Sequence, residues 1–338
     1  MGSARTLEGL IVDPIVGPFP GALVIAEGRI AAVERDDDLA GTPVVFPGFI
    51  DLQVNAADGI EEAGVTGFLL ATRDPDQPVE GLCLGFHLEG PFLNSEAAGA
   101  IPIDELQPVD LPLLGDWLAG GDVRLVTVSP EIPGGLDAIA LAAKQAVAAV
   151  GHTRANGTTV RAAVDAGARF ATHLWNAMAP LAARTTGPIA ELLLDERVTL
   201  GLIADGRHLH PSVEELTVRV AGPDRIALTS DLVANPAQRP DGILLGGDRA
   251  GAALIARMAR FGLREAALMA SLVPAQLLGL IDRGRIAPGF RADLAVLDEG
   301  FVPLETIAAG ETVWDVSYPQ FQKLDDRPPS THAPEDGA

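Results

Sequence analysis

The residues of this sequence that could perform chemistry occur where predicted strands end. Short apolar runs, each typical of a buried strand, are followed by side chains able to bind a metal ion or move a proton. Because the carboxyl ends of parallel strands lie on one face of a barrel, residues far apart in sequence would meet there. The pattern therefore predicts one shared site, and its members are Gln53 with Asn55, Glu89, His152, His173, His208 and Asp231.

The types of these side chains favour one class of reaction. Two neutral imidazoles and a carboxylate form a three-ligand site for zinc or a similar divalent ion and leave a position for water. The metal lowers the pKa of that water and polarises a carbonyl group. Asp231 could take the proton and later protonate the leaving group, and His208 could hydrogen-bond the oxygen on which negative charge develops. Together these roles predict metal-assisted hydrolysis of an amide or ester.

Each residue also has a structural interpretation that involves no chemistry. Asp231 could cap a helix, as aspartate often does, and His152 could cap the helix that follows it. His173 could be a packed core histidine. Glu89, His208 and His210 could lie in solvated loops. Of the two histidines, His210, which precedes Pro211, fits a loop position better than His208. None of these interpretations explains why the residues follow strand ends so regularly.

Length and composition limit the protein classes. A chain of 338 residues fits a barrel of about 250 residues with an accessory module. No stretch approaches the roughly 20 consecutive apolar residues of a membrane helix, and no basic region followed by an apolar run opens the sequence. We therefore expect a cytoplasmic protein with no membrane partner. A net charge of −22 argues against binding to nucleic acid.

Cysteine usage excludes two further kinds of site. Cys83 is the only cysteine, so neither an intrachain disulfide nor a tetra-thiolate zinc site can form. It lies within an apolar run, and a small buried residue is a better interpretation of it than a nucleophile.

The elements that must position the site fall into two groups. Short strands separated by tight turns fill residues 1–46 and 285–320, which predict one small β domain, a β-sandwich, built from both chain ends. The alternative is two unrelated flanking pieces. Residues 47–284 alternate between strand-like and helix-like stretches, which predicts a parallel sheet and, at this size, a (β/α)8 TIM-like barrel that forms the catalytic domain. Residues 321–338 are predicted to form a flexible tail, and His332 within it is discounted as a ligand.

Within the barrel region, individual elements can be predicted from apolar runs and from alanine-rich and leucine-rich segments. We expect strands over 123–128, 170–172, 199–203 and 225–229, and helices over 136–149, 158–166, 189–194, 213–220, 252–262 and 264–272. The run around Phe86 predicts a strand that ends shortly before Glu89.

At this level the sequence resembles a known family. Residues 46–55 are similar to the first-strand signature of the amidohydrolase superfamily, in which most members carry His-x-His. Gln53 and Asn55 stand there instead, a variant found in N-acetylglucosamine-6-phosphate deacetylases. The resemblance extends from about Leu7 to Val316, and five further segments resemble that family's motifs in its order. These segments are 87–94, 151–153, 171–178, 201–208 and 229–231, followed by a closing β segment over 284–297.

The resemblance implies specific roles. It makes Asp231 the general base and then the acid, and it places His208 at the scissile carbonyl. The absent His-x-His pair implies one divalent metal ion, with Zn²⁺ favoured over Fe²⁺, Mn²⁺ and Co²⁺. The substrate would be N-acetylglucosamine 6-phosphate, an amino-sugar phosphate. Arg184 would reach the phosphate from a neighbouring subunit, which implies a homodimer. The implied metal ligands are Glu89, His152 and His173, and the other implied substrate contacts are Asn176 and Ala177.

Two departures from the family pattern leave alternatives open. Ile101 stands where the family usually has a histidine that contacts substrate, and Ile101 cannot form a side-chain hydrogen bond. The segment 56–84 is short, with Thr72–Pro78 in place of an expected helix, so one barrel unit would be abbreviated. The alternatives are an amidohydrolase acting on a different N-acyl or cyclic amide, and a non-catalytic sugar-phosphate-binding protein.

Overall fold

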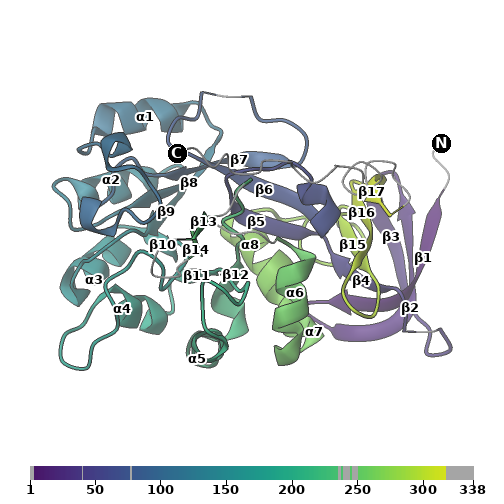
Figure 1. Ribbon diagram of the computed structural model, residues 1–338. Coiled ribbons are helices and arrows are strands. Elements are labelled where there is room, and N and C mark those ends of the chain that lie inside the picture. The colour runs from purple at the N-terminus through teal and green to yellow at the C-terminus, as the bar shows by residue number, and fades with distance from the viewer. Residues whose placement is uncertain are drawn as a thin grey trace, which may run out of the picture.

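The computed structural model describes residues 4–39, 41–76, 78–234, 237–238, 244–245 and 250–316. Figure 1 shows a strand-and-helix region beside a layer of strands that contains both the start and the end of the described chain. The predicted tail at 321–338 lies outside the described residues. None of the described helices is long and apolar enough to cross a membrane.

The first region is a parallel barrel. An eight-stranded sheet has the order β12-β11-β10-β9-β8-β7-β6-β5, and every hydrogen-bonded neighbour runs parallel. A parallel bridge between Val54 and Leu232 links the chain beyond β12 back to β5. The TIM-like barrel predicted from the sequence is thus confirmed. The strands are β5 (Phe49–Val54), β6 (Val65–Thr72), β7 (Cys83–Glu89), β8 (Val123–Val128), β9 (Val147–Val150), β10 (Ala168–Ala171), β11 (Thr199–Leu202) and β12 (Ile226–Leu228).

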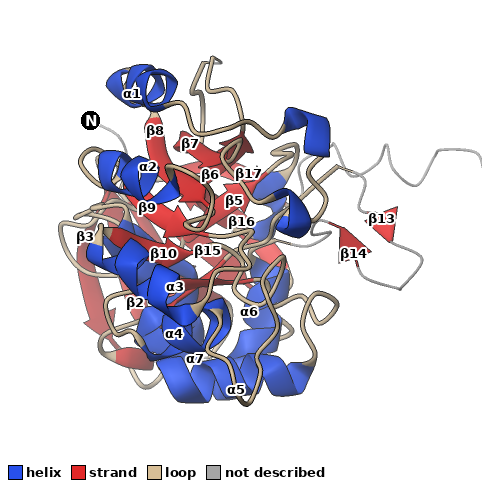
Figure 2. Cartoon of the chain, turned by 90° about the vertical axis from the view of Figure 1, so that its left-hand side faces the viewer, coloured by secondary structure: helices blue, strands red, loops and turns tan. Residues whose placement is uncertain are grey.

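Helices cover the outside of the barrel, and in Figure 2 α1 to α4 lie side by side over its strands. The helices are α1 (Leu111–Ala119), α2 (Gly135–Ala142), α3 (Gly157–Asp165), α4 (Pro188–Leu194), α5 (Pro211–Ala221), α6 (Ala252–Met258), α7 (Leu263–Ala267) and α8 (Val273–Leu277). A π-helical turn, Leu268–Leu272, joins the last two. Short 3-10 helices occur at Ile60–Ala63, Ser95–Ala97, Ile103–Glu105, Pro223–Arg225 and Ala259–Phe261.

Both chain ends enter one mixed sheet, as predicted. Its seven strands have the order β17-β16-β15-β4-β1-β2-β3, so C-terminal β15 lies against N-terminal β4. The positions of the domain boundaries remain a prediction. The strands are β1 (Arg5–Asp13), β2 (Gly17–Ala26), β3 (Arg29–Arg35), β4 (Val44–Pro47), β15 (Leu294–Leu297), β16 (Pro303–Ala308) and β17 (Glu311–Asp315), and a separate hairpin pairs β13 (Ala237–Gln238) with β14 (Leu244–Leu245).

Gly48 joins the two regions at a tight approach. It connects β4 directly to β5, and a Cβ atom at this position would lie 2.1 Å from the Thr66 hydroxyl oxygen. Only glycine allows the connection between β4 and β5 to pass this close to Thr66 of β6.

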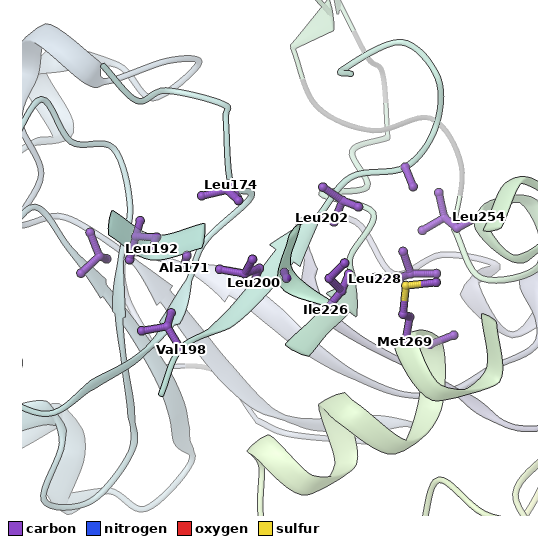
Figure 3. Close-up of a cluster of buried hydrophobic side chains, with 14 of the residues drawn as sticks. Ala171, Leu174, Leu192, Val198, Leu200, Leu202, Ile226, Leu228, Leu254 and Met269 are labelled. Carbon is purple, nitrogen blue, oxygen red and sulfur yellow. The ribbon is translucent and has the colours of Figure 1, made fainter. Parts of the chain in front are cut away.

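The core between the barrel and its helices is apolar and continuous. Figure 3 shows Leu200, Leu202, Ile226 and Leu228 of β11 and β12 in one cluster, in which Leu228 lies beside Met269. These side chains are almost completely buried. Burial of a leucine or isoleucine side chain contributes about 1.5–3 kcal/mol, so this layer fixes the strand ends that carry the candidate site.

Three sequence predictions require correction. The helix expected over 136–149 ends at Ala142, and Val147–Val150 forms β9. Valine is a strand former, and the alanines between the two valines are fully buried within the parallel sheet. Glu89 is the last residue of β7 and does not lie beyond it. Strand β6 and helix α1 had no counterpart among the predicted elements. No helix occurs between β6 and β7 in residues 73–76 and 78–82, so this unit is abbreviated, as predicted.

Candidate active site

The residues Glu89, His152 and His173 converge from three strands of the barrel. Glu89 ends β7, and each histidine lies two residues beyond the end of its strand, β9 or β10. The Glu89 Oε1 atom is 3.1 Å from His152 Nε2 and 3.0 Å from His173 Nε2, and the two Nε2 atoms are 3.1 Å apart. All three residues are buried. This is the arrangement that a three-ligand metal site requires.

The backbone turns sharply where the histidines leave their strands. His152 has φ 47° and His173 has φ 30°, in the left-handed region that non-glycine residues seldom adopt. Asp231, beyond β12, has φ 50°. Such conformations cost about 1–3 kcal/mol each and persist where the surroundings enforce them. The fold therefore uses backbone strain to direct these side chains into one space.

The hydrogen-bonding pattern tests whether this cluster fits a metal ion. His152 Nδ1 lies 2.9 Å from the carbonyl oxygen of Ala97, which can only accept, so Nδ1 carries the proton in the neutral ring. The lone pair of Nε2 then faces the Glu89 oxygen and the second imidazole. Lone pairs and a carboxylate oxygen directed at one point repel each other unless a cation or a proton lies between them. The donor set therefore fits a divalent metal ion, and the backbone carbonyl holds the ligand tautomer.

The charges of Glu89 and His173 shift each other's pKa. Burial alone would raise the pKa of Glu89, but the hydrogen bonds and charge of His152 and His173 hold that pKa well below its ordinary value. Burial alone would lower the pKa of His173, yet the hydrogen bond to Glu89 and the charge of that residue raise it. Glu89 is therefore ionised and ready to bind a cation.

Asp231 lies beside this cluster and is held by two amides. Its Oδ1 atom accepts hydrogen bonds from Gln53 Nε2 at 3.0 Å and from Asn55 Nδ2 at 2.8 Å, and the Gln53 amide also donates to Glu89 at 2.6 Å. Burial, followed by the negative charge of Glu89, raises the pKa of Asp231 to about 7. A carboxylate with a pKa near neutrality suits proton transfer in both directions.

His208 has a partner that orients it. Its Nδ1 atom is 2.9 Å from Asp205 Oδ2, while Asp205 Oδ1 accepts the backbone N–H groups of Arg207 and His208 at 2.8 and 2.9 Å. Burial would raise the pKa of Asp205, but the hydrogen bonds from His208 and these amides lower it to about 2. The ionised Asp205 therefore fixes the ring, so that Nε2 is the nitrogen available to the site.

Comparison with known proteins identifies the family. A model described as Amidohydrolase family matches residues 134–314. The N-acetylglucosamine-6-phosphate deacetylase of Bos taurus is 32% identical, in an alignment covering 88% of this chain and 89% of that protein. The chain belongs to the N-acetylglucosamine-6-phosphate deacetylase family, within the amidohydrolases. The family predicted from the sequence is thus confirmed.

Other members of this deacetylase family, and one related deacetylase, give the same picture. The Bacillus subtilis enzyme is 31% identical over 86% of this chain and 92% of its own length. An N-acetylgalactosamine-6-phosphate deacetylase of Shewanella is 29% identical over 82% of this chain and 74% of its own length. The D267A mutant of the Mycobacterium smegmatis N-acetylglucosamine-6-phosphate deacetylase, solved with N-acetylglucosamine 6-phosphate, superposes with a TM-score of 0.82 at 30% identity, covering 92% of this chain and 99% of that chain.

Most of the candidate site residues line one pocket of about 420 Å³. Glu89, His152, His173, His208 and Asp231 line it together with Asn55. The predicted substrate contacts Asn176 and Ala177 line it as well, next to Ile101. Arg184 does not line the pocket of its own chain and is exposed in the loop between β10 and α4. Gln53 is fully buried below the pocket.

Two supporting residues, Asp205 and His87, were not among the site residues predicted from the sequence. Asp205 precedes His208 by three residues, a spacing at which an aspartate can bond to the following amides, and this is the signal that could have identified it. His87 is buried beneath the metal cluster, with Nδ1 3.0 Å from the Leu52 carbonyl oxygen and Nε2 2.6 Å from the Thr127 hydroxyl. Burial lowers the pKa of His87 to about 4, so it is a neutral link between β5, β7 and β8.

Proposed function

We propose that this chain hydrolyses the acetamide of N-acetylglucosamine 6-phosphate to glucosamine 6-phosphate and acetate in a metal-dependent reaction. The observation that carries the proposal is the convergence of Glu89, His152 and His173 beside Asp231 in one pocket. Membership of the deacetylase family gives that geometry its substrate class.

Glu89, His152 and His173 would hold the metal ion, and Zn²⁺ is favoured by the two imidazoles and one carboxylate. A divalent ion bound there would polarise the acetyl carbonyl and make a water molecule more acidic. The identity of the ion is part of the proposal and is decided by metal analysis.

Asp231 would carry the proton. Its ionised Oδ atoms accept a proton from the attacking water, and the neutral acid then donates that proton to the departing amine nitrogen. In the metal-free protein, burial and the charge of Glu89 raise the pKa of Asp231 to about 7, so this carboxyl group holds a proton more readily than an ordinary aspartate. Gln53 and Asn55 hold the carboxyl group in place through its Oδ1 atom.

His208 would stabilise the oxygen on which negative charge develops. Asp205 accepts the Nδ1 proton, so Nε2 can donate a hydrogen bond to that oxygen when the ring is doubly protonated.

Binding of the sugar phosphate involves Asn176 and Ala177, which line the pocket. The proposal includes a homodimer in which Arg184 of one subunit reaches the phosphate in the other, supported by the exposure of Arg184 outside its own pocket. A cytoplasmic location is also part of it, since a single cysteine fits a compartment in which disulfides do not form.

Ile101 favours a second candidate. It lines the pocket with an apolar side chain, so the sugar can lose one hydrogen bond and a different N-acetyl amino-sugar phosphate or other N-acyl compound can be accepted. The Shewanella relative is named for N-acetylgalactosamine 6-phosphate, so related deacetylases differ in the sugar named as their substrate. The other alternative, a non-catalytic binding protein, does not account for the Asp231 carboxylate that Gln53 and Asn55 hold beside the metal ligands.

The decisive experiment measures amine release from N-acetylglucosamine 6-phosphate by purified, metal-analysed protein. Unphosphorylated N-acetylglucosamine and N-acetylgalactosamine 6-phosphate are measured in parallel. Release that requires both metal and phosphate supports the proposal, and the ratio between the two sugar phosphates assigns the substrate. Bound metal without release from any of the three compounds would reject this substrate class.

A further inference from the structure

The pocket contains cationic side chains that belong to its own chain. Among the described residues that line it, Arg73 and Arg154 carry a permanent positive charge. The chain as a whole has a net charge of −22, and the carboxylates of Glu89, Glu96 and Asp231 face the same space. A doubly charged phosphate entering this pocket therefore needs a local cation.

Arg73 occupies a strand-end position. It directly follows Thr72, the last residue of β6, on the face where Asn55 follows β5 and Glu89 ends β7. Strand β6 contributes none of the metal ligands or proton carriers. Because functional residues of parallel barrels gather at this face, Arg73 fills the position that the abbreviated unit would otherwise leave without a chemical group.

The hydrogen bonds of Arg73 leave part of its guanidinium unused. Its Nε and Nη2 atoms lie 2.6 and 2.5 Å from the same oxygen of Glu105, and among the described residues Nη1 has no acceptor. The Arg73 side chain is 32% exposed and the Glu105 side chain 44%. An ion pair this accessible is worth at most about 1 kcal/mol, so a phosphate could join Glu105 or displace it.

Arg154 is a weaker candidate for the same role. It pairs with Glu96 at 3.4 Å, and the two side chains are 50% and 76% exposed. The two arginines nevertheless share a feature, since Glu96 and Glu105 both belong to the segment 94–106, which also carries Ile101. The segment 94–106 therefore forms one ion pair on each side of the apolar Ile101, with Arg154 and with Arg73.

We infer that Arg73 binds the phosphate group of the substrate from within the same chain, in addition to any contact from a partner's Arg184. The inference rests on the proposed function for the identity of the substrate. A guanidinium suits this task because its planar fork can donate two parallel hydrogen bonds to phosphate oxygens. Arg73 would thereby determine the preference for phosphorylated sugars.

The competing explanation is that Arg73 only holds the segment 94–106 in place through Glu105. The variants R73Q and E105Q separate the two, because each removes the ion pair but only R73Q removes the guanidinium. R73K provides a third comparison, since it keeps the charge and loses the fork.

The experiment measures kcat and KM of the metal-loaded variants with N-acetylglucosamine 6-phosphate and with N-acetylglucosamine. We expect R73Q to lower kcat/KM for the phosphorylated sugar about 10- to 100-fold, mainly through KM, while the unphosphorylated sugar changes less than about threefold. R73K should lie between R73Q and the unmodified protein, and E105Q should show no loss. Equal losses in R73Q and E105Q, or equal losses on both sugars, would overturn the inference.

Calorimetry separates this inference from the proposed function. Glucosamine 6-phosphate and glucosamine are titrated into the unmodified protein and into R73Q. Weaker binding of the phosphorylated compound alone supports the role of Arg73 even if the protein deacetylates neither sugar, in which case only the proposed function fails. Unchanged binding of glucosamine 6-phosphate in R73Q rejects the role of Arg73.

Discussion

Replacement of Asp231 by asparagine should abolish turnover and at the same time stabilise the metal-free protein. Asparagine has nearly the same shape as aspartate and keeps a side-chain oxygen that can accept the hydrogen bonds from Gln53 and Asn55. It cannot take up or return a proton. The metal-binding atoms belong to other residues, so the amount of bound metal should not change.

The expected loss of activity follows from the role of a general base. Removing such a group typically costs a factor of about 10² to 10⁴ in rate, which corresponds to roughly 3–5 kcal/mol in transition-state stabilisation. A decrease of this size in kcat/KM, with about one metal ion still bound per chain, would distinguish loss of chemistry from loss of the site.

The effect on stability has a defined sign. Burial raises the pKa of Asp231 from 3.8 to about 7, so between these values the folded state holds a proton that the unfolded state releases. The stability of the metal-free protein should therefore fall as pH rises through this window. The shift corresponds to about 4 kcal/mol at pH 8, an upper bound because the residue keeps some contact with solvent. D231N lacks this penalty and should be more stable than the unmodified protein at pH 8, with the difference shrinking toward pH 4.

The assay combines three measurements on the same preparations. Amine release gives kcat/KM, elemental analysis gives the metal content, and urea unfolding of the chelator-treated proteins at pH 8 and pH 5 gives stability. D122N, at an exposed position, serves as the control for removing one negative charge. Turnover within tenfold of the unmodified protein, or a metal-free D231N protein that is less stable at pH 8, would refute the reasoning.

Three further predictions concern the metal ligands, the partner of His208 and a buried ion pair outside the pocket. Chelation should abolish turnover, added Zn²⁺ should restore it, and E89Q should bind metal at least tenfold more weakly, as elemental analysis after dialysis would show. D205N should lower kcat about 10- to 100-fold in steady-state kinetics on metal-analysed protein, because His208 loses the carboxylate that orients its ring. E214Q should cost about 2–4 kcal/mol in urea unfolding, because the Glu214 carboxylate is completely buried between Arg257 and Arg260, and a cost below about 0.5 kcal/mol would contradict this.

The sequence predicted those parts of the fold in which local pattern and tertiary environment agree. Strand β8 was predicted with its observed ends, because its apolar run matches the residues that the strand buries. Helix α3 was predicted within one residue at each end, because its apolar stripe matches the face that the helix buries. The helix over 136–149 extended too far because alanines continue past Ala142 into a buried strand. There a parallel sheet determines the conformation of residues whose intrinsic preference is helical.

The candidate site was predictable to the extent that it depends on strand ends. Glu89, His152, His173 and Asp231 follow the common geometry of parallel strands, so their convergence could be inferred without coordinates. Arg73 could not, because an arginine followed by Asp-Pro-Asp is typical of a solvated turn. Its place in the pocket depends on an abbreviated unit whose spatial consequence no local pattern contains.

Gln53 links the missing histidine pair to the chemistry of Asp231. One amide nitrogen of Gln53 donates to both Glu89 and Asp231, so a neutral group lies between two carboxylates. A metal ion in that position would place two positive charges there and would drive the pKa of Asp231 far down. The amide carries no charge, so in the metal-free protein burial and the repulsion from Glu89 raise the pKa of Asp231 to about 7. The Gln-x-Asn variant therefore suits a site with one metal ion, because a neutral amide that bonds to both carboxylates occupies the place of the missing histidine pair.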